Sequence, residues 1–249
     1  MLVGVSGWTY PPWRGDFYPA GLPQREELAY AAGRLTSIEI NGSFYALQKP
    51  ESYRRWRDQT PADFVLAVKG SRFITHMKRL GDPEAPLARF FGSGVFELGP
   101  KLGPVLWQLP KSFEYDAARL AAFFDRLPRT DPDGRPVRHA LEFRSRTFEQ
   151  AETYRLLREH DVACVLADTA GRWPKVDEDT SDFRYVRLHG DAELYTSGYD
   201  DTALDGWADR ISGWNKDTYV YFDNDAKGYA PHDAVRLIQR LGPAAPQRR

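Results

Sequence analysis

The sequence predicts an α/β fold, a TIM-like (β/α)8 barrel in which the sixth helix is missing or replaced by a loop. Eight short β-rich runs recur along the 249 residues, and most are apolar on both alternating faces, as strands covered on both sides are. Helical patterns separate most of these runs, which argues for a parallel sheet. Eight strands in about 240 residues match the usual length of a closed barrel.

The expected elements follow from the apolar patterns. The predicted strands are residues 2–6, 35–40, 64–69, 104–109, 137–143, 162–167, 183–189 and 218–222. The predicted helices are residues 24–33, 50–57, 86–98, 116–127, 147–160, 202–214 and 231–240. The fifth of these helices should begin with a capping box, because Gln150 follows Thr147 by three residues. The segment between Asp168 and Asp182 has no amphipathic period and a central Pro174, so no sixth helix is expected there.

Composition disfavours several classes of function. The net charge of −1 gives no general attraction to nucleic acid or to an anionic membrane, so such binding would need a local patch. The single cysteine, Cys164, lies in an apolar run and is interpreted as a buried hydrophobe rather than a nucleophile. No membrane span and no export signal are expected, and a cytoplasmic location follows as the default. Residues 1–249 are expected to form one domain whose tail frays from about Gly242.

Polar and aromatic residues follow all eight predicted strands, whereas the strand middles are mainly apolar. In a β/α barrel the C-terminal ends of the strands form the functional face. Alternate residues of a strand share one face, so a pair such as Glu142 and Arg144 points into the same mouth. Burying many charges for stability alone is unfavourable, because desolvation roughly cancels pairing, and a site is therefore the preferred interpretation. The alternative is a structural network in which Glu142 pairs with Arg144 or Arg187, and Glu39 with Lys69.

The residue types at these ends suggest three roles. The catalytic candidates are carboxylates for acid–base work and a histidine that titrates near neutral pH, namely Glu39, Glu142, His189 and Asp223. The substrate-binding candidates are cations, amides and rings suited to a small polar or anionic molecule, namely Trp8, Asn41, Phe44, Tyr45, Lys69, Arg72, His76, Gln108, Arg144, Arg187 and Asn224. A divalent metal is the one cofactor considered, with Glu39, Glu142, Asp168, His189 and Asp223 as candidate ligands, although no His-x-x-x-His motif occurs.

Several motifs together resemble the DUF72 (YecE-like) family. They are residues 39–45, Ile74-Thr75-His76, Leu106-Trp107-Gln108-Leu109-Pro110, Glu142-Phe143-Arg144, Arg187-Leu188-His189-Gly190 and Tyr221-Phe222-Asp223-Asn224. The resemblance covers nearly the whole chain and implies a TIM-barrel-like fold without an established biochemical function. The family pattern usually reads Phe-Asn-Asn, and here Asp223 replaces the first Asn, which adds a negative charge to the mouth.

Three functions are compatible with these residues. The first is an enzyme, in the simplest case a hydrolase, that acts on a phosphorylated or other anionic polar substrate in a pocket at the strand ends. The second is a nucleic-acid-binding protein or an endonuclease IV-like nuclease, because residues 49–79 hold eight Lys/Arg against three Asp/Glu with Tyr53, Trp56 and Phe73 interleaved. A solvated amphipathic helix, with Arg54, Arg55 and Arg57 on its outer face, is the preferred interpretation of that segment. The third is sugar chemistry at two carboxylates, or a non-catalytic ligand-binding barrel.

Overall fold

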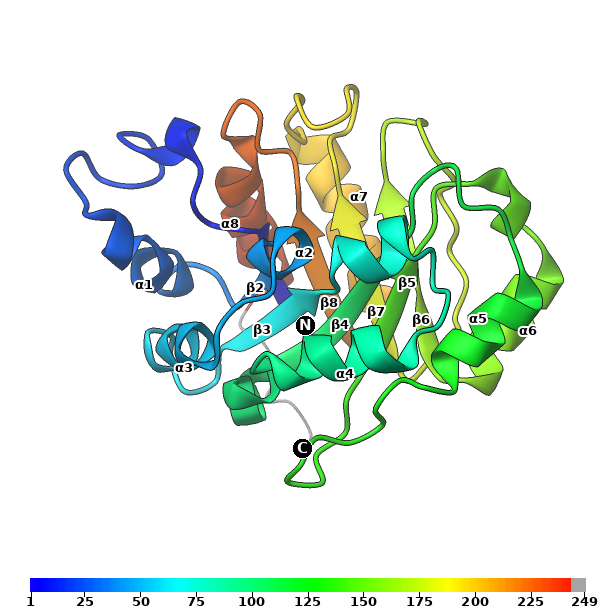
Figure 1. Ribbon diagram of the computed structural model, residues 1–249. Coiled ribbons are helices and arrows are strands. Elements are labelled where there is room, and N and C mark those ends of the chain that lie inside the picture. Colours follow the sequence, from blue (N-terminus) through cyan, green and yellow to red (C-terminus); the bar gives the residue numbers. More distant parts are fainter. Residues whose placement is uncertain (243–249) are drawn as a thin grey trace.

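A closed barrel of eight parallel strands forms the centre of the computed structural model, which describes residues 1–242 (Figure 1). The strands follow one another around the barrel in chain order: β1 (Leu2–Ser6), β2 (Ser37–Ile40), β3 (Val65–Lys69), β4 (Leu102–Gln108), β5 (His139–Glu142), β6 (Val162–Asp168), β7 (Phe183–Leu188) and β8 (Asp217–Phe222). β8 closes on β1, with Leu2 opposite Tyr219 and Val5 opposite Phe222. The predicted fold class is therefore confirmed.

Helices cover the outside of the barrel (Figure 1). The α-helices are α1 (Glu27–Ala32), α2 (Gly42–Tyr45), α3 (Pro50–Asp58), α4 (Glu84–Gly92), α5 (Ala117–Phe124), α6 (Ala151–Glu159), α7 (Asp201–Gly213) and α8 (Tyr229–Leu241). Short 3₁₀ helices are η1 (Pro11–Trp13), η2 (Gln24–Glu26), η4 (Val95–Lys101) and η5 (Arg146–Phe148), and η3 (Phe73–Met77) is a π-helix. The segment from β6 to β7, which the structure describes in full, contains no helix, as its pattern predicts.

The helices predicted over residues 24–33, 86–98 and 147–160 are each divided in the structure, the first into η2 and α1. The helix expected over residues 86–98 divides into α4 and η4, because Gly94 takes the left-handed conformation (φ +115°) and ends the first helix. The predicted capping box is wrong: α6 begins at Ala151, and the Ser145 hydroxyl instead caps η5 by accepting from the Thr147 amide at 3.3 Å. Thr147 Oγ1 accepts from the Tyr115 amide at 2.9 Å, so this side chain joins η5 to the segment before α5. The predicted fraying concerns residues 243–249, which lie outside the described part of the chain.

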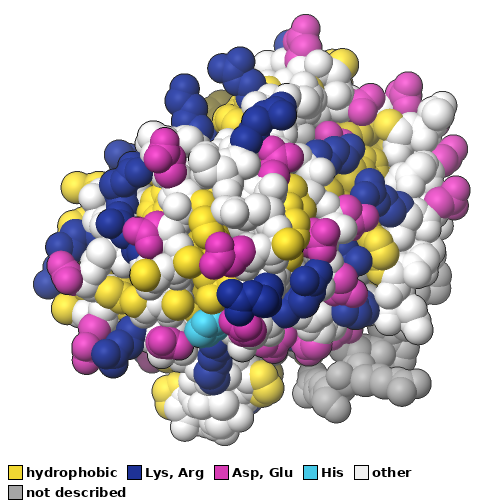
Figure 2. Space-filling view, turned by 90° about the vertical axis from the view of Figure 1, so that its right-hand side faces the viewer, with side chains coloured by type: hydrophobic (Ala, Val, Ile, Leu, Met, Phe, Trp, Pro, Cys, Tyr) yellow, Lys and Arg dark blue, Asp and Glu magenta, His cyan; other side chains and the backbone are white. Residues whose placement is uncertain are grey.

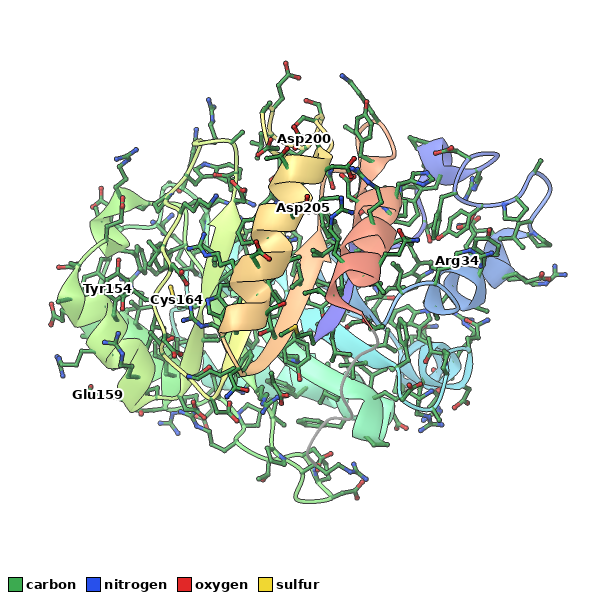
Figure 3. The ribbon with its side chains drawn as sticks, turned by 180° about the vertical axis from the view of Figure 1, so that it is seen from behind. Arg34, Tyr154, Glu159, Cys164, Asp200 and Asp205 are labelled. Atoms are coloured by element: carbon green, nitrogen blue, oxygen red, sulfur yellow. The ribbon has the colours of Figure 1, made fainter. Side chains whose placement is uncertain are left out.

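Side chains of the strands form two separate cores, because successive residues point to opposite faces. One core fills the barrel and consists of Leu2, Val65, Ala67, Leu106, Ala140, Ala163, Val165, Ala167, Phe183, Tyr185, Tyr219 and Tyr221. The other lies between the strands and the helices and includes Val68, Trp107 and Phe123. Cys164 belongs to this outer layer (Figure 3), where burial raises the pKa of its thiol to about 12. That environment supports the interpretation of Cys164 as a buried hydrophobe.

Charged side chains on the helices are mostly paired at the surface. α7 and α8 pack side by side, and Arg240 of α8 reaches Asp205 of α7 at 2.6 Å (Figure 3). Acidic and basic side chains are interspersed on the face that carries α5 and α6 (Figure 2). Among residues 1–242, no helix combines the length and the apolar character needed to cross a bilayer.

Candidate functional site

Polar side chains replace apolar ones at the C-terminal end of the barrel interior. The barrel interior is filled by side chains that include Ala67, Ala140, Tyr185 and Tyr221. A residue two positions further along the same strand points in the same inward direction. These inward residues are Lys69, Glu142, Arg187 and Asp223, and with Glu39 of β2 and His189 after β7 they form what we call the mouth cluster. The alternation that fills the barrel with apolar groups therefore also aims these charges into its mouth.

Arg187 lies at the centre of the mouth cluster and is fully buried. Its Nη2 donates to Glu39 Oε1 at 3.0 Å and to Asp223 Oδ2 at 3.0 Å, and its Nη1 donates to Glu142 Oε2 at 2.8 Å. The Tyr185 hydroxyl donates to Glu39 Oε2 at 2.6 Å. One guanidinium thus joins three carboxylates from β2, β5 and the end of β8, as its fan of five donors allows.

Two carboxylates of this network, those of Glu142 and Asp223, are held in their charged forms. Burial alone would raise the pKa of Glu142, but the nearby Arg187 and Arg144 outweigh it and the pKa lies well below its usual range. Burial is likewise outweighed at Asp223, where Arg187 and His189 lower the pKa to about 2. Glu39 pairs with Arg187 rather than with Lys69, so that part of the expected ion-pair network is wrong.

His189 is fully buried beside Asp223. Its Nδ1 lies 3.0 Å from Asp223 Oδ2 but is not aligned for a hydrogen bond, so the contact is ionic when the ring carries a proton. Its Nε2 lies 3.4 Å from Arg187 Nη1 and 4.0 Å from Glu142 Oε2. Because the ring has no exposed surface, it acts on the neighbouring side chains rather than directly on a molecule in solution.

Lys69 differs from the other charged residues of the cluster. Within the described residues, its ammonium has neither a hydrogen bond nor an ion pair, and it lies 4.5 Å from the ring centroid of Phe44. Burial and the nearby Arg187 lower the pKa of Lys69 to about 8. Phe44 is fixed above it because Ser43 Oγ donates to the Lys69 carbonyl at 2.7 Å and ties α2 to the end of β3. The next residue is Gly70, which lets the backbone after Lys69 pass close to Trp107, because a Cβ there would come within 2.3 Å of the Trp107 ring.

Arg144 is the second cation that reaches the mouth. Its Nε donates to Glu142 Oε1 at 3.1 Å, and its guanidinium lies 3.8 Å above the Trp173 ring. Its Nη2 donates to the Tyr195 hydroxyl at 3.3 Å. Trp173 comes from the loop that replaces the sixth helix, so this loop positions a cation at the mouth. Sequence patterns did not identify Trp173 or Tyr195, because both lie in loops without periodicity.

Asp225 and Tyr10 are further residues at the mouth that the sequence did not single out. Asp225 is buried, and its Oδ1 has no hydrogen-bond partner among residues 1–242. Burial and the charge of Asp223 raise the pKa of Asp225 well above its usual range, so a neutral acid is favoured. Tyr10 lies near Asp225 and Asn41 and donates to the Ser6 carbonyl at 2.5 Å. Asp225 has the same strand parity as Asp223, and that signal could have identified it.

The remaining predicted site residues fall into two groups. Around the mouth lie Asn41, Phe44, Tyr45, Arg72 and His76, on or beside α2 and η3. Burial and the nearby Lys69 lower the pKa of His76 to about 4, so its ring is neutral at pH 7. Gln108 has the inward parity of Leu106 and lies opposite Glu142 in the β4–β5 register, and its Nε2 donates to the Leu109 carbonyl at 2.7 Å. Away from the mouth cluster lies Trp8, which packs on Trp56 at 5.4 Å between ring centroids.

Asp168 and Asn224 also point away from the mouth cluster, because each has the opposite strand parity. Asp168 pairs with Lys175 at 3.1 Å, and Asn224 Nδ2 donates to Asp233 Oδ2 at 2.9 Å. Nowhere in residues 1–242 are three or more His, Cys, Asp or Glu side chains arranged to hold a metal ion. The predicted metal ligands of the mouth cluster are directed at the Arg187 guanidinium, so their arrangement does not fit a metal.

The sequence matches the family described as "Protein of unknown function DUF72" over residues 2–249. The chain belongs to the DUF72 family. UPF0759 protein YecE of Escherichia coli (strain K12) is 30% identical over 170 residues, which span 68% of this chain but only 59% of YecE. UPF0759 protein YunF of Bacillus subtilis (strain 168) is 24% identical, with 97% of this chain and 94% of YunF aligned.

Solved structures of DUF72 proteins share the barrel. A DUF72 family protein from Thermotoga maritima MSB8 superposes with a TM-score of 0.81 at 27% identity, covering 96% of this chain and 98% of that one. D-psicose 3-epimerase from Clostridium cellulolyticum H10 has a TM-score of 0.54 at 10% identity, covering 97% and 98% of the two chains. At that identity the likeness shows the barrel fold alone.

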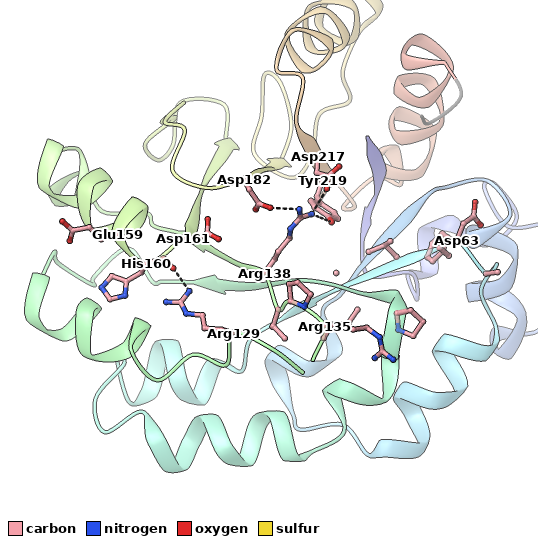
Figure 4. A pocket seen from close by; sticks show the side chains of 18 residues that line it. Asp63, Arg129, Arg135, Arg138, Glu159, His160, Asp161, Asp182, Asp217 and Tyr219 are labelled. Atoms are coloured by element: carbon pink, nitrogen blue, oxygen red, sulfur yellow. Dashed lines mark hydrogen bonds and ion pairs between the residues drawn. The ribbon is translucent and has the colours of Figure 1, made fainter. Parts of the chain in front are cut away.

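A cavity of about 900 Å³ lies at the opposite, N-terminal end of the DUF72 barrel (Figure 4). Arg138 is its central cation, and it pairs with Asp182 at 2.9 Å and with Asp217 at 2.8 Å. Its Nη1 also donates to the Tyr219 hydroxyl at 3.0 Å. Paired charges at the start of the strands indicate a stabilising role, whereas catalytic residues of β/α barrels come from the other end. We therefore assign the candidate site to the mouth, despite the size of this cavity.

Proposed function

We propose that this DUF72 protein is an enzyme that binds a small polar substrate through an anionic group, and that Lys69 is its acid–base residue. Lys69 carries the proposal because its ammonium lacks a partner within residues 1–242 although the residue is only 8% exposed, while the carboxylates around it are paired with Arg187. Burying an unpaired charge costs stability. A phosphate or carboxylate of a substrate would supply the missing partner.

Hydrolysis is the reaction class that we propose. With a pKa of about 8, roughly nine-tenths of Lys69 carries the ammonium at pH 7, so it can pair with the anion and donate a proton to the leaving oxygen as the scissile bond breaks, and the attacking water then returns a proton to the amine. Arg144 is positioned by Glu142 and Trp173 to contact the oxygens of the anion. Asp223, whose side chain is 17% exposed, is the cluster carboxylate that reaches the mouth surface. Glu39, Arg187 and His189 lie below and act as positioning residues.

Sugar chemistry at Glu39 and Glu142 is less well supported. Their side chains are 0% and 1% exposed, and both are held by Arg187. A glycosidase needs its two carboxyl groups on either side of the scissile bond. These two carboxylates lie on one guanidinium beneath the mouth instead.

Esterase and phosphatase assays on a panel of small chromogenic phosphate and carboxylate esters test the proposal. The wild type should turn over at least one of them, with a kcat/KM that falls as the pH rises through about 8, where Lys69 loses its positive charge. Lys69→Met should lower turnover by about 10²- to 10⁴-fold, the usual share of a general acid or base. Lys111→Met, which removes an exposed lysine, is the matched control. Full activity in Lys69→Met would refute the assignment, and anion binding without turnover would identify a non-catalytic barrel.

A further inference from the structure

Two short segments beside the mouth expose apolar side chains to solvent. They are residues 42–49, which contain α2, and residues 71–79, which contain η3, and Figure 1 shows both at the same end of the barrel. Their exposed side chains are Tyr45, Leu47, Phe73 and Met77, with exposed fractions of 70%, 43%, 41% and 64%. The segments touch, because the Phe44 and His76 rings pack edge-to-face with 5.2 Å between centroids.

These two segments are also uniformly basic. They hold the exposed cations Lys49, Arg72 and Lys78 together with Arg79, and neither segment contains Asp or Glu. The nearest acidic contact is that of Lys78 with Asp82 at 3.8 Å, where the carboxylate is 95% exposed and screened by water. The face over α5 and α6, in contrast, mixes both signs (Figure 2). We call the four exposed apolar residues and Lys49, Arg72 and Lys78 the rim.

We infer that the rim binds single-stranded nucleic acid. Exposed rings such as Tyr45 and Phe73 offer faces on which unpaired bases stack, and cations between them suit the phosphates of the same strand. The mouth extends the same arrangement of cations beside aromatic rings. Lys69 lies beside Phe44 there, and Arg144 lies beside Trp173. A membrane surface fits less well, since α2 has four residues and η3 has five, too short for an interfacial amphipathic helix.

The rim includes part of the basic segment that the sequence suggested, residues 49–79, but not the portion on α3. Tyr53 is fully buried, and Trp56 packs against Trp8, so neither ring is free to stack on a base. Arg54 is paired with Glu51 at 3.0 Å and with Glu97 at 2.9 Å. The outer face of α3 is therefore an ordinary solvated helix face, and the inferred nucleic-acid surface is limited to the rim. The inference does not depend on what the mouth turns over.

Fluorescence anisotropy with a labelled 12-nucleotide oligothymidylate tests the inference. Binding should be saturable at 50 mM salt, with a Kd on the order of 1–100 μM. Three phosphate contacts predict a slope of about −2 in log K against log salt, which is roughly fifteen-fold weaker binding at 200 mM. Tyr45→Ala and Phe73→Ala should each weaken binding by about five-fold or more, because each removes a stacking face.

Charge variants separate the phosphate contacts from stacking. Arg72→Gln should reduce the salt slope by about 0.7, whereas Arg155→Gln on α6, which is 61% exposed on a mixed face, should leave binding unchanged. All of these side chains are at the surface, so circular dichroism should report an unchanged fold.

Three results would overturn the inference. One is the absence of saturable binding to the oligonucleotide at 50 mM salt. Another is binding that Tyr45→Ala and Phe73→Ala leave unchanged. The third is that the protein does not bind the oligonucleotide but sediments with vesicles of 70% phosphatidylcholine and 30% phosphatidylserine, and that the rim substitutions abolish this sedimentation. That result would assign the rim to a membrane surface.

Discussion

Replacing Arg187 with Met should destabilise the protein strongly and in a pH-dependent manner. The substitution keeps much of the side-chain volume but removes the donors that reach Glu39, Glu142 and Asp223 at 2.8–3.0 Å. Removing one partner of a buried ion pair costs about 3–5 kcal/mol, because the remaining charges stay buried without compensation. Here three carboxylates lose the same partner, so we expect the upper part of that range at pH 7.

The sign of the pH dependence follows from the lowered carboxylate pKa values. In the wild type, Asp223 titrates at about 2, below its ordinary value of 3.8, so its pairing contributes stability above pH 4 that is lost as the pH falls toward 2. Without Arg187, burial and mutual repulsion raise the pKa values of these carboxyl groups. Protonation at mildly acid pH then removes the uncompensated charges and restores part of the variant's stability. The free-energy gap between wild type and Arg187→Met should therefore narrow from pH 7 to pH 4.

Urea unfolding followed by circular dichroism at pH 7 and pH 4.5 measures both effects. Arg155→Met, on the surface of α6, is the control and should change stability by less than about 0.5 kcal/mol. A loss below about 1 kcal/mol for Arg187→Met, or a gap that is the same at both pH values, would refute the description of Arg187 as the charge that holds the mouth together.

Three further substitutions probe single features of the mouth. Lys69→Met should raise stability at pH 7 by about 2–3 kcal/mol at most, because the depressed pKa of about 8 measures the cost of the buried charge. This gain in stability should shrink as the pH rises from 8 to 10.5. Urea titrations at pH 7 and pH 10 check both expectations. Asp225→Asn mimics the neutral acid, so in thermal melts it should be at least as stable as the wild type at pH 8 and should lose that advantage near pH 4. Gly70→Ala should cost about 1–3 kcal/mol in urea unfolding, since its Cβ would meet the buried Trp107 ring at 2.3 Å, and wild-type stability there would contradict the packing.

The barrel was predictable because strand and helix periods are local properties of the sequence. Strands covered on both faces are apolar throughout, and the missing helix after β6 shows as a segment without period around Pro174. The alternation of side chains along each strand also predicts which residues point into the mouth. It places Arg187 and Asp223 inward, and by the same rule it turns Asp168 and Asn224 away from the mouth, a consequence that the sequence-based selection did not apply.

The pairing within the site could not be predicted in the same way. Glu39 and Arg187 are 148 positions apart and meet only because the barrel closes, so the sequence could not determine whether Glu39 pairs with Lys69 or with Arg187. Trp173, Tyr195 and Tyr10 reach the mouth from loops, whose course depends on the strands that they connect rather than on a local pattern.

A pH titration of Lys69 by ¹³C NMR, with lysine labelled at Cε, tests most directly that the mouth holds an unpaired amine ready for an anion. The resonance is assigned by its absence from Lys69→Met. We predict a pKa of about 8 in buffer without a bound anion, and an upward shift when inorganic phosphate is added, because a bound anion favours the ammonium. A pKa near 10.5 that phosphate leaves unchanged would contradict the assignment of this site.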